Sequence, residues 1–220
     1  MEIKYLIKFT SEYKYARDLV DGSLFMNQAA FYHDIENGQG DVREATFSNT
    51  SMVYIGDNKP IYCLYMVYKH QIVDSKIAIE NKIIYDFNAK YAVIVNYDTF
   101  IEKLRELKKE YSISFGSVNY KVLSIEDSKE FLIGKKNTLF FKKPFFSYQQ
   151  EFRISIDENL EYILGKRKLN GKNIEVIEGY KPKVYHLKKN LNGIARIINV
   201  QDCKKTGGFT YIDLDLGAQV

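Results

Sequence analysis

The segment of residues 145–155 reads FFSYQQEFRIS, and its second half alternates between polar and apolar side chains. The polar positions are Gln149, Glu151 and Arg153. The apolar positions are Phe152, Ile154 and, one residue further on, Ile156. Because successive side chains of a strand point to opposite faces, this pattern predicts a strand with an apolar core face and a second, polar face. The polar face is either a solvated surface or the floor of a polar site.

Strand-like segments recur along the chain, whereas helical patterns are few. Strands are expected at residues 3–9, 23–27, 51–55, 61–68, 77–79, 82–85, 91–95, 118–123, 151–156, 161–164, 173–177, 183–187, 194–200 and 209–214. Helices are expected at residues 11–20, 28–36, 98–109 and 125–132. We therefore expect one α+β domain over residues 1–220, with antiparallel sheets and with helices concentrated in the N-terminal half.

The composition is that of a folded protein without metal or disulfide cross-links. The chain has 220 residues, and with 45% hydrophobic residues it is too apolar for a disordered chain. Its two cysteines and three scattered histidines offer no zinc spacing, so we expect no metal. No signal peptide is recognisable, and no apolar run reaches the ~18–20 residues that cross a bilayer. We expect a cytoplasmic protein with no membrane partner and a mild net charge of +4.

Two basic stretches have alternative interpretations. Residues 134–146, GKKNTLFFKKPFF, interleave lysines with phenylalanines. This composition suits a platform for single-stranded nucleic acid, or an element with a buried aromatic face and lysines toward water, which we favour. Residues 165–172, GKRKLNGK, indicate the tip of a hairpin that its charge keeps soluble.

The triplet Gln149-Gln150-Glu151, which enters the predicted strand, is similar to the carboxylate motif of the ADP-ribosyltransferase superfamily. In that superfamily the glutamate binds the nicotinamide ribose and stabilises the oxocarbenium-like charge that develops as nicotinamide leaves. The opening segment YLIKFTSEYKYARDLVDGSLFMN also resembles the superfamily's first strand, helix and glycine. The resemblance implies NAD as the cofactor and a protein or nucleic acid as the acceptor.

The same resemblance implies roles for individual residues. Glu151 is the expected catalytic carboxylate, and Gln149 helps to choose the acceptor. Lys8 stands where the superfamily has arginine or histidine in its first strand. The remaining cofactor contacts are expected from Tyr62 or Tyr65 in the IYCLY segment, where the superfamily has Ser-Thr-Ser or a tyrosine, from Arg153, and from Arg43. Arg43 belongs to the GDVREA loop, whose Asp41 and Glu44 we also expect on the side of Glu151.

A second resemblance covers residues 5–156 and leads to other functions. The segments KFTSEYKYARDLVDGSLFMN, GDVREA, PIYCLY and FSYQQEFRI are similar to those of a group of uncharacterised bacterial and phage proteins. This favours a non-enzymatic phage or mobile-element protein that binds and inhibits a host defence protein through residues 135–146, or a nucleic-acid-binding module. In either case, Glu151 and Arg153 form a structural pair with neighbours such as Arg43.

Overall fold

The computed structural model describes residues 1–29, 59–122, 124, 127, 129–130, 137–169 and 172–215. Several predictions lie outside these residues: the strand at 51–55, Lys135 and Lys136, and the GDVREA loop with Asp41, Arg43 and Glu44. Most of the helices expected at 28–36 and 125–132 also lie outside them.

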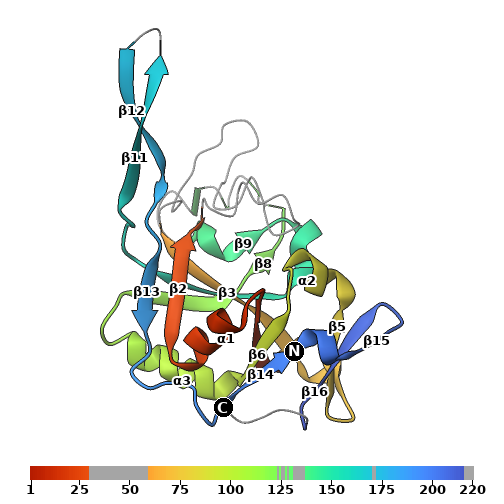
Figure 1. Cartoon of the computed structure of the whole chain (residues 1–220). Coiled ribbons are helices and arrows are strands. Elements are labelled where there is room, and N and C mark those ends of the chain that lie inside the picture. Colours follow the sequence, from red (N-terminus) through yellow and green to blue (C-terminus); the bar gives the residue numbers. More distant parts are fainter. Residues whose placement is uncertain are drawn as a thin grey trace.

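The main sheet of the described residues has eight strands, and all of its strand pairs are antiparallel (Figure 1). Its strands are β1 (Ile3–Thr10), β2 (Ser23–Gln28), β3 (Pro60–Tyr68), β6 (Tyr91–Asn96), β7 (Ile113–Ser117), β10 (Glu151–Ile156), β13 (Lys183–His186) and β14 (Ala195–Asn199). They run in the order β13-β2-β3-β1-β6-β14, and β10 also pairs with β3 and with β7. The prediction of a sheet-rich fold with antiparallel sheets is therefore confirmed.

The two faces of the main sheet are covered by different elements. Helices α1 (Tyr13–Val20) and α3 (Tyr97–Leu107) contribute to the core on one face, which includes Leu6, Leu104 and Phe152. The other face packs against a four-stranded sheet in the order β15-β16-β5-β4, and their shared core includes Ile7 and Ile212. The bounds of these strands are β4 (Ile72–Val73), β5 (Lys76–Glu80), β15 (Lys204–Thr206) and β16 (Phe209–Asp213).

Short helices connect and cover the sheets. They are η2 (Lys69–Gln71), α2 (Asn81–Asp86), η3 (Thr138–Phe140), η4 (Pro144–Gln149) and η5 (Val200–Asp202). Helices α1, α2 and α3 end before residue 108, whereas the 3-10 helices occur in both halves of the chain. The strand predicted at residues 82–85 is wrong, because this segment belongs to α2. Ile83 and Ile84 are both buried, which a helix allows on one face, and Lys82 forms an ion pair with Asp86 one turn later.

Strand β10 has the predicted bounds, but both of its faces are buried. Phe152 and Ile154 lie in the core as expected. The opposite face, with Glu151 and Arg153, is buried as well, so a solvated surface is the wrong interpretation of its polar residues. Contacts to this face come from η3 and from β9 (Phe141–Lys142), which pairs in parallel with β8 (Asn119–Tyr120). Lys142 of β9 also binds Gln149 at the end of η4. The charged face of β10 is therefore part of the interior.

The hairpin of β11 (Tyr162–Leu169) and β12 (Lys172–Tyr180) extends away from the rest of the molecule (Figure 1). Its two strands pair only with each other among the described residues. Leu169 stands opposite Lys172 in the last pair of the register, so the described residues of the segment 165–172 lie at the end of a hairpin, as predicted. We call residues 162–180 the arm.

Candidate functional site

A gap opens beside the central strand β3. Ile61 pairs with β2 and with β10, and Tyr65 pairs with β1 and with β10, so β1 and β2 share the side of β3 that is opposite β10. On that side β1 pairs with residues 65–68 of β3 and β2 pairs with residues 60–61. Residues 62–64 thus have no strand partner there among the described residues.

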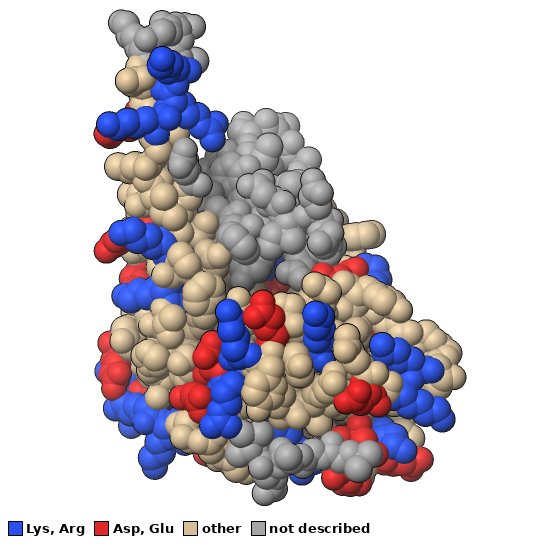
Figure 2. Space-filling view, viewed as in Figure 1, with Lys and Arg blue, Asp and Glu red and all other residues tan. Residues whose placement is uncertain are grey.

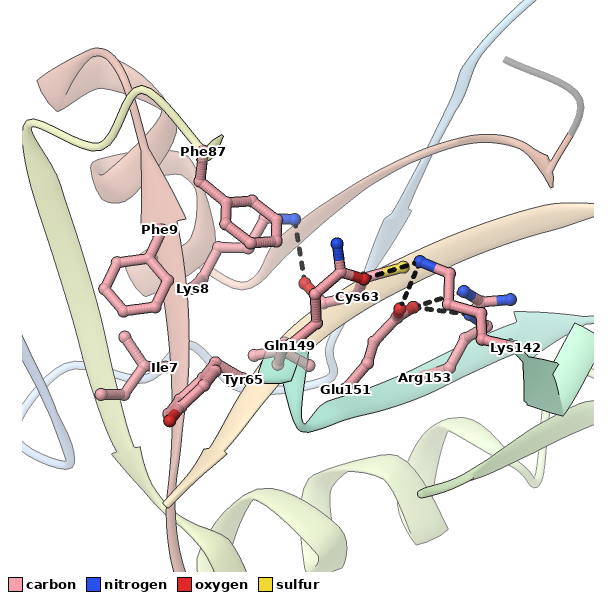
Figure 3. Close-up of a pocket in the computed structure, with 11 residues that line it drawn as sticks. Ile7, Lys8, Phe9, Cys63, Tyr65, Phe87, Lys142, Gln149, Glu151 and Arg153 are labelled. Atoms are coloured by element: carbon pink, nitrogen blue, oxygen red, sulfur yellow. Dashed lines mark hydrogen bonds and ion pairs between the residues drawn. The ribbon is translucent and has the colours of Figure 1, made fainter. Parts of the chain in front are cut away.

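Lys8 occupies this gap. Its Nζ donates a hydrogen bond to the backbone oxygen of Cys63 at 3.0 Å (Figure 3). The same Nζ lies 4.3 Å from the centre of the Tyr62 ring. The side chain thereby supplies the hydrogen bond that a neighbouring strand would otherwise give. Burial lowers the pKa of Lys8, because desolvation disfavours the charged amine. A carbonyl and an aromatic face are its contacts, and no carboxylate pairs with it among the described residues.

Glu151 lies between two buried cations. Its Oε2 accepts from Lys142 Nζ at 2.9 Å, and its Oε1 accepts from Arg153 Nε at 2.7 Å. The guanidinium of Arg153 is 0% exposed and also donates to the backbone oxygen of Leu139. Because both carboxylate oxygens are held from different sides, the orientation of the carboxylate is fixed within the fold.

Arg153 and Lys142 keep Glu151 ionised. Burial alone would raise its pKa, but Arg153 and Lys142 outweigh burial and hold the pKa well below its ordinary value. Burial raises the pKa of the neighbouring Cys63 thiol to about 12, and the Glu151 charge adds to that rise. At neutral pH the site therefore holds an ionised carboxylate beside a neutral thiol.

Gln149 is brought to the same place by a tight turn. Its Oε1 accepts from Lys142 Nζ at 3.0 Å, so one ammonium group contacts both members of the Gln-x-Glu motif. Gln150 between them has a φ of 40°, in the left-handed region that side chains other than glycine rarely adopt. Its side-chain oxygen is buried without a hydrogen-bond partner. Backbone strain and an unsatisfied buried acceptor are features that concentrate at functional sites.

A small cavity joins these residues. It has a volume of about 40 Å³, and its lining includes Lys8, Tyr65, Gln149, Glu151 and Arg153. A cavity of this size holds roughly one or two water molecules. A larger cavity, of about 950 Å³, lies between β14 and the second sheet and is lined by none of the residues predicted for the site.

The structure therefore brings most of the predicted site residues together. Tyr62 does not line the cavity: its ring contacts Lys8 but packs in the core on the other face of β3. Tyr65 lines the cavity, although its ring packs edge-on against Phe9 and its hydroxyl accepts a hydrogen bond from Gln71. Arg43 lies outside the described residues.

The sequence interpretation missed Lys142. We had favoured lysines toward water in residues 134–146, but Lys142 and Phe146 are buried, and Lys143 and Phe145 are exposed. The sequence did contain a signal for its burial: Lys142 lies between phenylalanines and only nine residues before Glu151. Tyr120 was missed as well: its hydroxyl accepts a hydrogen bond from the backbone N–H of Glu151 at 2.8 Å and so fixes the start of β10.

Comparisons with family models, with curated proteins and with solved structures found no match to this chain. The described residues contain no cluster of three or more histidine, cysteine, aspartate or glutamate side chains that could hold a metal ion. None of the helices in the described part of the chain is long and apolar enough to span a membrane.

Proposed function

We propose that the cavity beside β3 is an NAD site and that the chain is an ADP-ribosyltransferase-like enzyme, built as one α+β domain and acting in the cytoplasm. One observation carries this proposal: three separate segments bring Lys8, Tyr65, Gln149 and Glu151 to the same cavity. These four residues were named from the sequence alone. They lie far apart along the chain, so their convergence on one cavity supports the proposal.

The ionised state of Glu151 suits the proposed reaction. When the bond between the ribose C1′ and nicotinamide breaks, positive charge develops on the ribose, and a fixed carboxylate stabilises that charge. The acceptor, a group on a protein or a nucleic acid, then attacks C1′ and loses its proton. Gln149, held beside Glu151 by Lys142, is placed to contact that acceptor.

Lys142 forms an ion pair with Glu151 and so offsets the negative charge that the proposed reaction needs. Arg153 is tied to the Leu139 carbonyl and stays as the group that orients Glu151. Lys142 reaches Glu151 and Gln149 through one flexible side chain, so it is the cation that we expect to turn to the NAD pyrophosphate. Lys8, which has no carboxylate partner among the described residues, supplies the second phosphate contact.

NAD requires a wider site than the cavity of about 40 Å³. We propose that the widening occurs in the gap beside residues 62–64 of β3, because among the described residues a side chain, Lys8, takes the place of a strand partner there. Strained Gln150, between η4 and β10, marks a second point at which the lining can rearrange.

Thermal melting with and without NAD tests the site. At a hundredfold excess over its Kd, NAD stabilises a protein that binds it only when folded by about 2.7 kcal/mol. We expect a clear upward shift of Tm for the wild type and little shift for Lys8→Ala, each measured against its own melt without NAD. Lys4→Ala is the matched control, since Lys4 lies on the same strand but pairs with Glu2 near the surface. A wild type whose Tm ignores NAD contradicts the proposal and leaves a non-enzymatic binding protein.

A further inference from the structure

The arm is a two-stranded ribbon with both faces open to solvent. Its register holds eight paired positions, from Tyr162 opposite Tyr180 to Leu169 opposite Lys172. A strand of eight residues is roughly 26 Å long. An isolated two-stranded hairpin is only marginally stable in water. A ribbon of this length therefore adds little to the stability of the fold, and a short turn would connect the neighbouring strands equally well.

Positive charge is concentrated at the end of the arm. Lys166, Arg167 and Lys168 are consecutive and exposed, and residues 165–173 contain no acidic residue. In Figure 2 lysine and arginine side chains gather toward the end of the arm. Glu175 stands opposite Lys166 in the register, but no ion pair joins them. The charges at this end are thus available to a partner.

The three cations do not share one face. Because side chains alternate along a strand, Lys166 and Lys168 point to one side of the ribbon and Arg167 points to the other. A flat acidic surface contacts only one side of a ribbon. A groove with negative charge on both walls contacts both sides, and the major groove of duplex DNA, about 12 Å wide, admits a two-stranded β-ribbon between two phosphate backbones.

We propose that the arm binds duplex DNA by inserting its basic end into the major groove, with Lys166, Arg167 and Lys168 contacting phosphates of both strands. Phosphate contacts carry no direct sequence information, so the binding is largely independent of sequence. The inference rests on the arm alone and does not depend on NAD chemistry at the distant cavity. The exposed apolar side chains nearer the base, Tyr162 and Leu164, are what a protein partner would use instead.

Fluorescence anisotropy with a labelled 20-base-pair duplex tests this proposal over a series of salt concentrations. Three phosphate contacts give a slope of log K against log[salt] of about −2.7. We expect the triple variant Lys166→Ala, Arg167→Ala, Lys168→Ala to lose about tenfold or more in affinity, together with nearly all of that slope. Its melting curve should match the wild type, because all three side chains are exposed.

A second triple variant controls for net charge. Arg105→Ala, Lys108→Ala, Lys109→Ala also removes two lysines and one arginine, from exposed positions at the end of α3. It should keep the affinity and the salt slope of the wild type. Equal losses in the two variants, tighter binding of single-stranded than of duplex DNA, or no salt-dependent binding by the wild type would each overturn the proposal. The last outcome would point to a protein partner at Tyr162 and Leu164.

Discussion

Strands β10 and β11 both carry charged side chains, yet the fold places these charges in opposite environments. β10 pairs with two neighbours and is buried at all six positions, including Glu151 and Arg153. β11 pairs with one neighbour, and its charged residues Lys166, Arg167 and Lys168 are exposed. The difference comes from what covers each strand. Residues 137–149 contact the polar face of β10 and bring Lys142 to Glu151, whereas the arm has no covering element among the described residues.

This comparison separates two uses of charge. A buried charge must be paired, and breaking a buried pair costs about 3–5 kcal/mol because it leaves an uncompensated ion. An exposed ion pair contributes roughly 0–1 kcal/mol. The charges of β10 are therefore part of the stability of the fold, and those of the arm are free for interactions with other molecules.

Removing an arginine from each strand should show this difference most clearly. Arg153→Ala removes one of the two cations that hold the buried Glu151 carboxylate and leaves a hole in the interior, so we expect a loss of about 3–5 kcal/mol in the free energy of unfolding. Arg167→Ala on the arm should change it by about 0.5 kcal/mol or less. Urea unfolding of the two variants measures both values, and equal stabilities would contradict the burial of the β10 cluster.

The apolar residues of the two strands should differ in the same direction. Phe152→Ala removes a ring that packs against Tyr97 and Phe115, at a cost of about 3–5 kcal/mol. Leu164→Ala on the arm, where the side chain is 61% exposed, should cost about 0.5 kcal/mol or less. A soluble Phe152→Ala protein with an unchanged melting temperature would be inconsistent with the placement of β10.

Acid unfolding compares two glutamates. The folded pKa of Glu151 lies below its ordinary value near 4.5, so its ionised form stabilises the fold fully above that pH, and this stabilisation is lost as the pH falls toward the folded pKa. Glu151→Gln should therefore flatten the dependence of stability on pH below about 4.5. Glu161→Gln at the base of the arm should change the profile much less, because the Lys181 ammonium lowers the pKa of Glu161 only through an exposed, solvent-screened pair. Parallel profiles for wild type and Glu151→Gln would exclude the predicted linkage.

A smaller change than at Arg153 or Phe152, and one of opposite sign, is expected at Gln150. Glycine relieves the left-handed strain of about 1–2 kcal/mol but adds chain entropy that costs about 0.5–1 kcal/mol. Removing the unpaired buried oxygen adds to the gain, so Gln150→Gly should be more stable by about 1 kcal/mol. Thermal melting measures this change, and a destabilised variant would show that the Gln150 side chain makes a contribution of its own.

The sequence predicted many of the strands, because their patterns are local, but it missed β7, which pairs with β10 in the main sheet. The alternation of Phe152 and Ile154 placed β10, and the apolar run at residues 91–95 placed β6. The strand expected at residues 82–85 failed because β-branched residues there suggested a strand, while tertiary packing of Ile83 and Ile84 requires a helix.

The site was only partly predictable, for a physical reason. The motif identified Glu151 and Gln149. The polar face of β10 is buried because residues 137–149 pack against it, and the sequence pattern of β10 itself does not indicate this contact. Lys142 was missed for this reason. The gap that Lys8 fills arises from where β1 and β2 stop pairing with β3, which is a property of the register and not of any single segment.

The release of nicotinamide tests the central claim, that Glu151 is a catalytic carboxylate, most directly. The measurement incubates wild type, Glu151→Gln and the control Asp157→Asn with NAD and candidate acceptors, and follows nicotinamide by chromatography. Asp157 is a surface residue that pairs with Lys59, so its variant removes a carboxylate just beyond the end of β10. The account predicts release by wild type and control, a loss of about 10²–10³-fold in Glu151→Gln, and NAD affinity that changes little. No release by the wild type, or equal release by wild type and Glu151→Gln, would contradict it.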